Sequence, residues 1–175
     1  YEAYERKLNH DTTILQVGEE ENLRLFSEYI QIVPDEEKAE SRLVKNESKE
    51  ELLDIKEVET PNQKSIEEVS SFLHVDAKSV CKSMVYYDIA NNRYVLVLVR
   101  GDREVNEIKV VNTLDIAEHE LVLASYNDIE KLGSVEGFVG PYNFNKDVVV
   151  LVDEEVTQMQ NIVVGANKKD VHLKN

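Results

Sequence analysis

The sequence predicts an α/β fold, in which a mixed, largely antiparallel sheet carries short flanking helices. Short runs rich in β-branched and aliphatic residues, such as 93–100, are separated by turn residues, which is the pattern of strands. Between them, short segments begin at a serine with an acidic residue three positions later, which is the pattern of a helix start. The regular strand–helix–strand alternation of a doubly wound fold is missing, so a mainly antiparallel arrangement is favoured.

Residues 1–59 are expected to form an acidic, partly helical arm, and residues 60–175 the main domain. The first 60 residues carry 17 acidic and 8 basic side chains, a net charge of −9. Charged segments with few aromatic residues form solvated helices or loosely ordered arms. Within this arm, apolar residues in 22–33 recur at spacings of three and four, which predicts an amphipathic helix.

The main domain is expected to begin with a helix and a hairpin. Ser65 and Glu68 are spaced as a capping box and predict a helix start. The apolar face of that helix is expected to consist of Ile66, Val69, Phe72 and Leu73. A short turn over 76–80 leads into an alternating strand over 82–89. The turn at Asn91 and Asn92 then predicts a hairpin with the very apolar strand 93–100.

Further short elements are expected after the hairpin. Residues 121–124, 147–152 and 161–164 have the composition of strands, and His172 falls on a final strand. Ser125 is spaced as a second helix cap. Gly133, Gly137 and Gly140 lie within nine residues, so the loop that contains them permits close approach of its backbone to another group.

Composition excludes several classes of protein. The net charge of −15 argues against a domain that binds nucleic acid unaided, because neutralising phosphates supplies much of that affinity. Contact with nucleic acid would have to be local or be made mostly by another domain. No run approaches the roughly 18 apolar residues of a membrane span. The single cysteine, Cys81, and polar first residues favour a cytosolic location without a signal peptide.

Two further expectations concern the ends of the chain and metal binding. The chain starts at Tyr1 rather than Met and stops three residues after His172, so we expect a fragment of a longer protein. Walker, GxGxxG, HExxH and CxxC motifs are missing from the sequence, and its histidines lack metal-ligand spacing. No metal site is therefore expected, and Cys81 is expected to be structural rather than nucleophilic.

Polar residues at two strand ends are candidates for a site. The end of the most apolar strand carries polar residues, namely Arg100, Gly101, Asp102 and Asn106. Polar groups at such a place often line a site, although an exposed turn would look the same. Lys82 shares a strand face with Met84 and Tyr86. Its ammonium could bind a phosphate or orient a carbonyl, and the alternative is an edge lysine whose stem lies along apolar surface.

Two glycine-containing segments are further candidates. Gly140 and Pro141 end a loop whose backbone N–H groups could stabilise an oxyanion, the alternative being an ordinary glycine turn. Gly165 and Asn167 form a tight bend of small residues before His172. A lone histidine of this kind is more often structural than catalytic.

Together these segments stand in the order of a known family. They are residues 60–62, 65–69, 80–83, 98–102, 104–107, 140–141, 153, 165–167 and 172, and the most specific is Val99-Arg100-Gly101-Asp102-Arg103-Glu104-Val105-Asn106-Glu107. Over residues 60–175 the chain resembles the insertion (editing) domain of bacterial-type prolyl-tRNA synthetases, in the YbaK-like aminoacyl-tRNA deacylase family. Ser83 departs from the threonine frequent there, and residues 168–171 replace a glycine-containing turn.

The resemblance implies a role for each matching residue. It implies that Lys82 is needed for deacylation, that Asp153 and His172 line the substrate pocket, and that Gly140 and Pro141 lie near the scissile ester. The other matching residues expected to bind substrate are Arg100, Gly101, Asp102, Asn106, Gly165 and Asn167.

The resemblance also implies a function, post-transfer editing by hydrolysis of mischarged alanyl-tRNA(Pro). The expected partners are the acceptor end of that tRNA and the rest of the synthetase chain, with no membrane. No cofactor is expected for editing, and ATP would serve only the synthetic domain of the parent enzyme. Since the sequence offers no obvious general base, a water molecule assisted by the terminal ribose hydroxyl is favoured. The alternatives are a freestanding trans-editing deacylase and a non-catalytic tRNA-binding module of the same fold.

Overall fold

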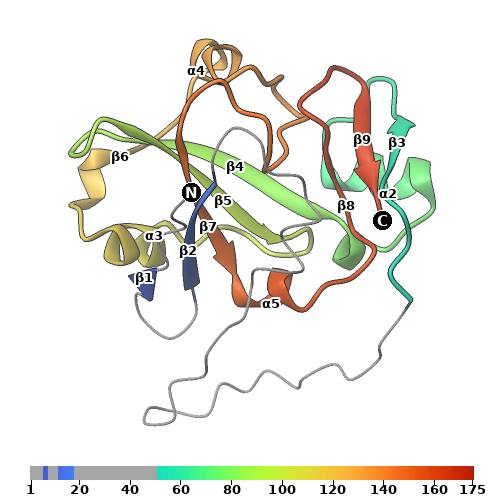
Figure 1. Cartoon of the computed structure of the whole chain (residues 1–175), viewed down its shortest axis with the longest axis horizontal. Coiled ribbons are helices and arrows are strands. Elements are labelled where there is room, and N and C mark those ends of the chain that lie inside the picture. Colours follow the sequence, from blue (N-terminus) through green and yellow to red (C-terminus); the bar gives the residue numbers. More distant parts are fainter. Residues whose placement is uncertain (1–5, 8–11, 18–50) are drawn as a thin grey trace, which may run out of the picture.

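The structure, a computed structural model, describes residues 6–7, 12–17 and 51–175 (Figure 1). The strands of its larger sheet are β1 (Arg6–Lys7), β2 (Thr12–Val17), β4 (Cys81–Asp88), β5 (Arg93–Arg100), β6 (Leu121–Leu123) and β7 (Val148–Asp153). Those of its smaller sheet are β3 (Lys56–Glu59), β8 (Val163–Gly165) and β9 (Val171–Lys174). The helices are α2 (Ile66–Leu73), α3 (Glu107–Leu114), α4 (Tyr126–Lys131) and α5 (Glu154–Thr157), with 3₁₀ turns η1 (Ala77–Ser79) and η2 (Glu118–Glu120).

The sheet topology confirms the predicted fold class. The larger sheet has the order β1-β2-β7-β5-β4-β6, and the smaller sheet the order β3-β9-β8. Within these sheets β5 and β7 run parallel, and the other neighbouring strands run antiparallel. The strands thus divide between two sheets, whereas the sequence led us to expect one mixed sheet.

The predicted hairpin is present as β4 and β5, paired from Cys81 opposite Arg100 to Asp88 opposite Arg93. Its turn is stabilised by the Asp88 carboxylate, which is fully buried. This carboxylate accepts hydrogen bonds from the Asn91 side chain at 2.9 Å and from Arg93 Nε at 2.8 Å. Buried carboxylates need such partners, so the two polar groups fix the turn.

Two predicted helix starts are confirmed. Ser65 Oγ accepts from the Glu68 amide at 3.2 Å, while the Glu68 carboxylate accepts from the Ser65 amide at 3.0 Å, which completes the capping box of α2. Ser125 caps α4 in the same way with Asp128. The expected apolar face of α2 is only partly buried, because Val69 is 1% exposed but Phe72 is 45% exposed.

Strand β5 lies at the centre of the core and is buried on both faces. Leu96 and Leu98 pack on one face, in a cluster that includes Ile129 of α4. Val95, Val97 and Val99 pack on the other face against α3, through Val110 and Leu114. Figure 1 shows α3 and α4 on either side of this hairpin. Helix α3 was not predicted, because its cap, Asn106, lies in the run of polar residues 100–107, called the polar run below, which we interpreted as a candidate site.

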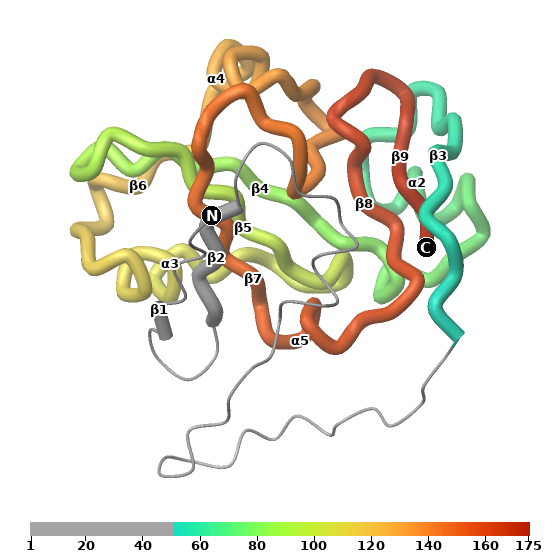
Figure 2. Tube along the Cα trace, in the orientation of Figure 1, coloured from blue at the N-terminus to red at the C-terminus, as the bar shows by residue number. Residues whose placement is uncertain are grey.

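Residues before Thr60 contribute strands to both sheets. β3 pairs with β9, with Val58 opposite His172, and β2 pairs with β7, with Thr12 opposite Asp153. Figure 2 shows β3, β9 and β8 together at one end of the domain. The proposed division at residue 60 stays a prediction, and the helix expected over 22–33 lies outside the described residues. In the described part of the chain, no helix has the length and apolar character needed to span a membrane.

Candidate functional site

The ends of three neighbouring strands bring one group of predicted residues together. β4 begins where its antiparallel partner β5 ends, and β7, parallel to β5, ends at the same edge, with Leu98 opposite Val152. Side chains from these ends contact one another and form what we call the strand-end cluster. Its members are Lys82, Arg100, Asp102, Arg103, Glu104, Asp153 and Glu155.

Lys82 is held at this edge by two oxygen atoms. Its Nζ donates to the carbonyl oxygen of Arg103 at 3.0 Å and to Oε1 of Glu104 at 2.8 Å. As expected, its strand face is shared with Met84 and Tyr86, which pack in the cluster beneath α3. The lysine side chain is 18% exposed, whereas Glu104 is 91% exposed. The ammonium group therefore lies in a partly buried, fixed position and faces a carboxylate in solvent.

The two arginines of the cluster are neutralised by less exposed carboxylates. Arg100 forms two hydrogen bonds with Asp102 and lies 3.4 Å from Glu155. Arg103 donates to both carboxylate oxygens of Glu155 at 2.9 Å. The hydrogen bond from Arg100 lowers the pKa of Asp102, and that from Arg103 lowers the pKa of Glu155. Both carboxylates are therefore charged at neutral pH.

Asp153 supports this network by capping helix α5 with its side chain. It is the N-cap of α5, and its Oδ1 accepts from the Glu155 amide at 2.9 Å. Capping fixes the first turn of α5 and thus places Glu155 beside the two arginines. The expected place of Asp153 in a substrate pocket stays a prediction.

Two residues of the polar run have structural contacts. The Gly101 amide donates to Val80 O at 2.7 Å, and a Cβ at Gly101 would lie 2.4 Å from Ala77 O, so only glycine fits. Asn106 is the N-cap of α3, where its side chain accepts from the Lys109 amide at 3.1 Å. Substrate binding by Gly101 and Asn106 stays a prediction.

The second group of predicted residues forms what we call the glycine corner, which consists of Gly140, Pro141, Gly165 and Asn167. A Cβ at Gly140 would lie 1.9 Å from Gly165 O, so the two segments can approach only because both positions are glycine. The Asn167 side chain joins them, accepting from the Gly140 amide at 2.8 Å and donating to Gly140 O at 3.2 Å. Ser134 Oγ also donates to Asn167, at 2.6 Å.

These contacts exclude two amides of the Gly140 loop as donors to an oxyanion, and the expectation for the rest of the loop stays a prediction. The Gly140 N–H is used by Asn167, and the Phe138 N–H donates to Val135 O at 2.9 Å. Pro141 has no N–H to give. Gly140 and Pro141 are buried, so they shape the corner through backbone packing rather than through donation to a ligand.

His172 adjoins the glycine corner, because it lies opposite Gly165 in the sheet. It is 4% exposed, and its Nδ1 lies 2.6 Å from Thr60 Oγ1. Its ring also contacts Phe138, with centroids 5.4 Å apart. Burial lowers the pKa of His172 to about 4, so the imidazole is neutral at pH 7.

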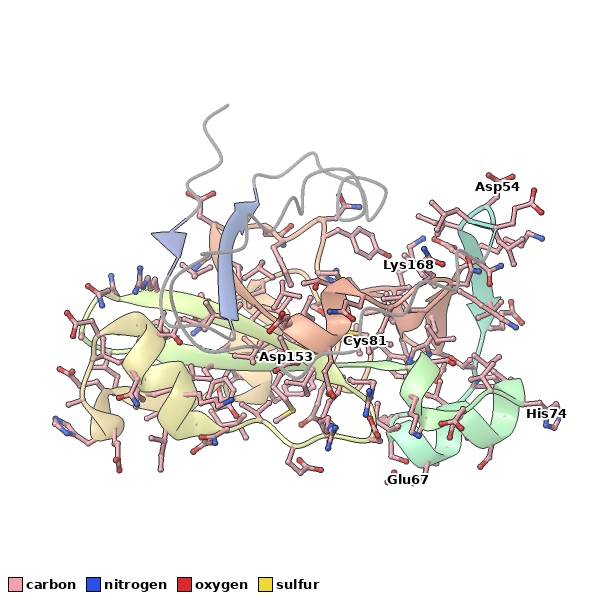
Figure 3. All side chains as sticks on the ribbon, turned by 90° about the horizontal axis from the view of Figure 1, so that it is seen from below. Asp54, Glu67, His74, Cys81, Asp153 and Lys168 are labelled. Atoms are coloured by element: carbon pink, nitrogen blue, oxygen red, sulfur yellow. The ribbon has the colours of Figure 1, made fainter. Side chains whose placement is uncertain are left out.

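An isolated β-bridge connects the strand-end cluster with the glycine corner. Val80 pairs in parallel with Val163, which brings the chain just before β4 beside β8. Lys82 lies two residues after Val80, and Gly165 lies two residues after Val163. In Figure 3, Cys81 and Asp153 mark the strand ends, and Lys168 marks the loop that follows the glycine corner.

Sequence reasoning missed several partners of the predicted residues. Two of these partners, Arg103 and Glu104, belong to the polar run, so the sequence could have indicated that they contact the site. Glu155 was missed because nothing in the sequence places α5 beside β5, and Thr60 was not linked to His172. Among the described residues no three His, Cys, Asp or Glu side chains are grouped to hold a metal ion. The expectation that editing needs no metal stays a prediction.

The fold defines a class of small α/β domains with known structural relatives. A structure described as "a putative trans-editing enzyme for prolyl tRNA synthetase" superposes with a TM-score of 0.61 and 19% identity, covering 69% of this chain and 75% of that chain. A hypothetical protein of known structure superposes with the same TM-score and 18% identity, covering 70% of this chain and 81% of its own. These two proteins share the fold.

The family follows from a sequence match. The family model of the aminoacyl-tRNA editing domain matches residues 60–175, and the chain belongs to this family. It is 45% identical over 141 residues to the proline–tRNA ligase of Thermoanaerobacter sp. (strain X514), covering 80% of this chain and 24% of the ligase. With that of Bacillus subtilis (strain 168) it shares 47% identity over 133 residues, covering 73% of this chain and 22% of the ligase. The chain thus spans about a quarter of these relatives, and the resemblance inferred from sequence is confirmed.

Proposed function

We propose that this chain hydrolyses the ester bond of mischarged alanyl-tRNA(Pro), as the editing domain within a proline–tRNA ligase. Membership of the aminoacyl-tRNA editing domain family and the similarity to proline–tRNA ligases support this assignment. The structural observation that carries it is Lys82, a partly buried ammonium held at the meeting point of three strand ends. The partners are then the acceptor end of tRNA(Pro) and the rest of the ligase, in the cytoplasm.

Editing of alanine follows from the limits of a binding pocket. A synthetic site shaped for proline cannot strongly exclude a smaller amino acid, because a missing methylene costs only about 1–3 kcal/mol of discrimination. A second site that admits alanine and excludes proline removes the error.

Lys82 is the residue to which we assign the central role. Its ammonium binds a phosphate of the tRNA end or polarises the ester carbonyl, and either contact lowers the energy of the charged transition state. The Arg103 carbonyl fixes the position of the Nζ atom. Asp102, Arg100 and Asp153 support the same edge through Glu155 and α5.

His172 is a poor general base. Its pKa of about 4 makes the neutral imidazole a weak proton acceptor at pH 7, and its Nδ1 already contacts Thr60. We therefore assign His172 to the wall of the pocket. The attacking water is activated with help from the ribose hydroxyl of the substrate, and we propose no metal or cofactor for the step.

The test is deacylation of alanyl-tRNA(Pro) by a proline–tRNA ligase that carries this domain. The Lys82→Ala variant is expected to lose about 100-fold or more of its hydrolysis rate. Lys78→Ala, which removes an exposed lysine four residues away, is the matched control and should keep the wild-type rate. Equal rates for wild type and Lys82→Ala would remove the mechanism. The isolated chain is a weaker test, because its charge of −15 predicts poor capture of tRNA.

A freestanding deacylase is the second candidate, because one of the solved structures that share this fold is described as "a putative trans-editing enzyme for prolyl tRNA synthetase". The coding sequence around this chain distinguishes the two. Class II synthetase motifs on both sides support a domain of a ligase, and a start codon near Tyr1 would favour the freestanding enzyme. If neither the ligase that carries this domain nor the isolated chain hydrolyses alanyl-tRNA(Pro), the remaining candidate is a non-catalytic tRNA-binding module.

A further inference from the structure

Glu104 differs from the other acidic residues of the strand-end cluster in its exposure. Its side chain is 91% exposed, whereas Asp102 is 28% exposed and Glu155 20% exposed in their pairs with the arginines. Glu104 meets the Lys82 ammonium at 2.8 Å, and the Lys82 side chain is only 18% exposed. The carboxylate thus covers the exposed side of a cation that is otherwise held by the protein.

The second partner of Lys82 is neutral and belongs to the backbone. The Arg103 carbonyl accepts from Nζ at 3.0 Å and stays in place if the Glu104 side chain moves away. Because the Glu104 partner lies in solvent, its pair with Lys82 contributes little to stability, so exchange of the carboxylate for another anion costs little. Because Glu104 is already solvated before it moves, its displacement changes its hydration little.

We propose that Glu104 is an intramolecular competitor, which occupies Lys82 in the free protein and is displaced by a phosphate group of the substrate. This inference rests on the proposed function. Glu104 acts only by occupying Lys82 and does not touch the reacting atoms, so it is not a catalytic residue. A carboxylate and a phosphate that share one ammonium repel each other, so binding of the phosphate favours movement of Glu104 away from Lys82. Glu104 therefore lowers the affinity of the site for phosphate and leaves the bound state unchanged.

The test compares anion binding by the full chain and two variants that each remove one negative charge. Glu104→Gln keeps the length of the side chain but removes the competitor. Glu118→Gln removes an exposed carboxylate in η2 and serves as the matched control. The probes are inorganic phosphate and a short single-stranded RNA, titrated while the amide NMR signals of Arg103 and Glu104 (or its replacement) are followed.

Glu104→Gln is expected to bind each probe about two- to five-fold more tightly than wild type, since an ion pair with one partner in solvent is worth about that ratio. Glu118→Gln should match wild type, and Glu104→Asp should restore much of the competition. The gain should shrink at high salt and vanish in the Lys82→Ala background. Unchanged or weaker binding by Glu104→Gln would overturn the inference.

Deacylation kinetics of the ligase separate this inference from the proposed function. If Glu104 competes with substrate, Glu104→Gln lowers KM and leaves kcat unchanged. A fall in kcat would show instead that Glu104 orients Lys82, and the inference would fail while the proposed function stands. If wild type does not hydrolyse alanyl-tRNA(Pro) at all, the proposed function fails, and the phosphate titration still decides whether Glu104 competes for Lys82.

Discussion

Thr60 and His172 lie 112 positions apart in the chain, yet Thr60 Oγ1 and His172 Nδ1 are 2.6 Å apart in the interior. Thr60 is fully buried and His172 is 4% exposed. Each polar atom thus satisfies the other where water has no access. The contact joins the segment after β3 to β9, the central strand of the smaller sheet, whose other neighbour β8 carries Gly165 of the glycine corner.

Removing the hydroxyl of Thr60 should weaken this part of the fold. Thr60→Val keeps the shape of the side chain but leaves the buried Nδ1 atom unpaired, which costs about 1–3 kcal/mol of unfolding free energy. Thr60→Ser keeps the hydroxyl and should lose less. Denaturant unfolding of both variants measures the difference, and equal losses would show that the contact does not stabilise the fold.

The stability of the domain should fall in mild acid because of His172. Burial lowers its pKa from the ordinary value of 6.5 to about 4 in the folded state, so below pH 6.5 the unfolded chain binds more protons than the folded one. The stability that the neutral, buried imidazole of His172 contributes is fully present above pH 6.5 and is lost as the pH falls towards 4. The loss is up to about 1.4 kcal/mol per pH unit, or about 2 kcal/mol between pH 6.5 and 5.

The measurement is the free energy of unfolding from pH 7 to pH 5 for wild type and His172→Gln. The variant cannot titrate at this position, so its stability should depend less on pH in this interval. Comparing the two slopes removes the contribution of every other titrating group. Parallel slopes would mean that His172 does not titrate abnormally in the folded protein.

Substitution of Gly140 should be poorly tolerated. A Cβ at this position would lie 1.9 Å from Gly165 O, which is backbone and cannot move aside cheaply. Gly140→Ala should therefore cost about 3 kcal/mol of stability. Gly137→Ala is the control, since its Cβ would meet only the Lys64 side chain, and its positive φ predicts a smaller cost of about 1–2 kcal/mol. A smaller cost at Gly140 than at Gly137 would contradict the close contact.

Asn106 tests whether a residue of the polar run binds substrate or only caps a helix. Asn106→Ala should lower stability by about 1 kcal/mol, and Asn106→Ser, which can still cap α3, should restore most of it. If capping is its whole role, deacylation by Asn106→Ser matches wild type. A serine variant that is stable but slow would show that the asparagine contacts substrate.

Much of the local structure could be predicted because its signals are short in sequence. The caps at Ser65 and Ser125 involve residues three positions away, and the hairpin from β4 to β5 follows from alternation around the Asn91–Asn92 turn. α3 was missed because an asparagine cap inside a charged run has the same composition as an exposed site. The alternation of β4 also predicted correctly that Lys82 shares a face with Met84 and Tyr86.

The candidate site was predicted residue by residue but not as an arrangement. The sequence singled out Lys82, Arg100 and Asp153 without showing that their strand ends meet, or that Glu104 covers Lys82. It also suggested that the Gly140 amide is available to a ligand, whereas Asn167, 27 positions away, accepts its hydrogen. A side chain reveals which bonds it can form, and its neighbours in space decide which of them it does form.

The sequence by itself determined the family, the helix caps, the central hairpin and the face of β4 that carries Lys82. All of these depend on residue order or on neighbours within a few positions. Only the tertiary structure decided the contact of Arg103 with Glu155 across 52 positions, the approach of Gly140 to Gly165, and the pairing of Thr60 with His172. Such contacts arise from the order and register of strands in the two sheets, which local sequence patterns do not specify.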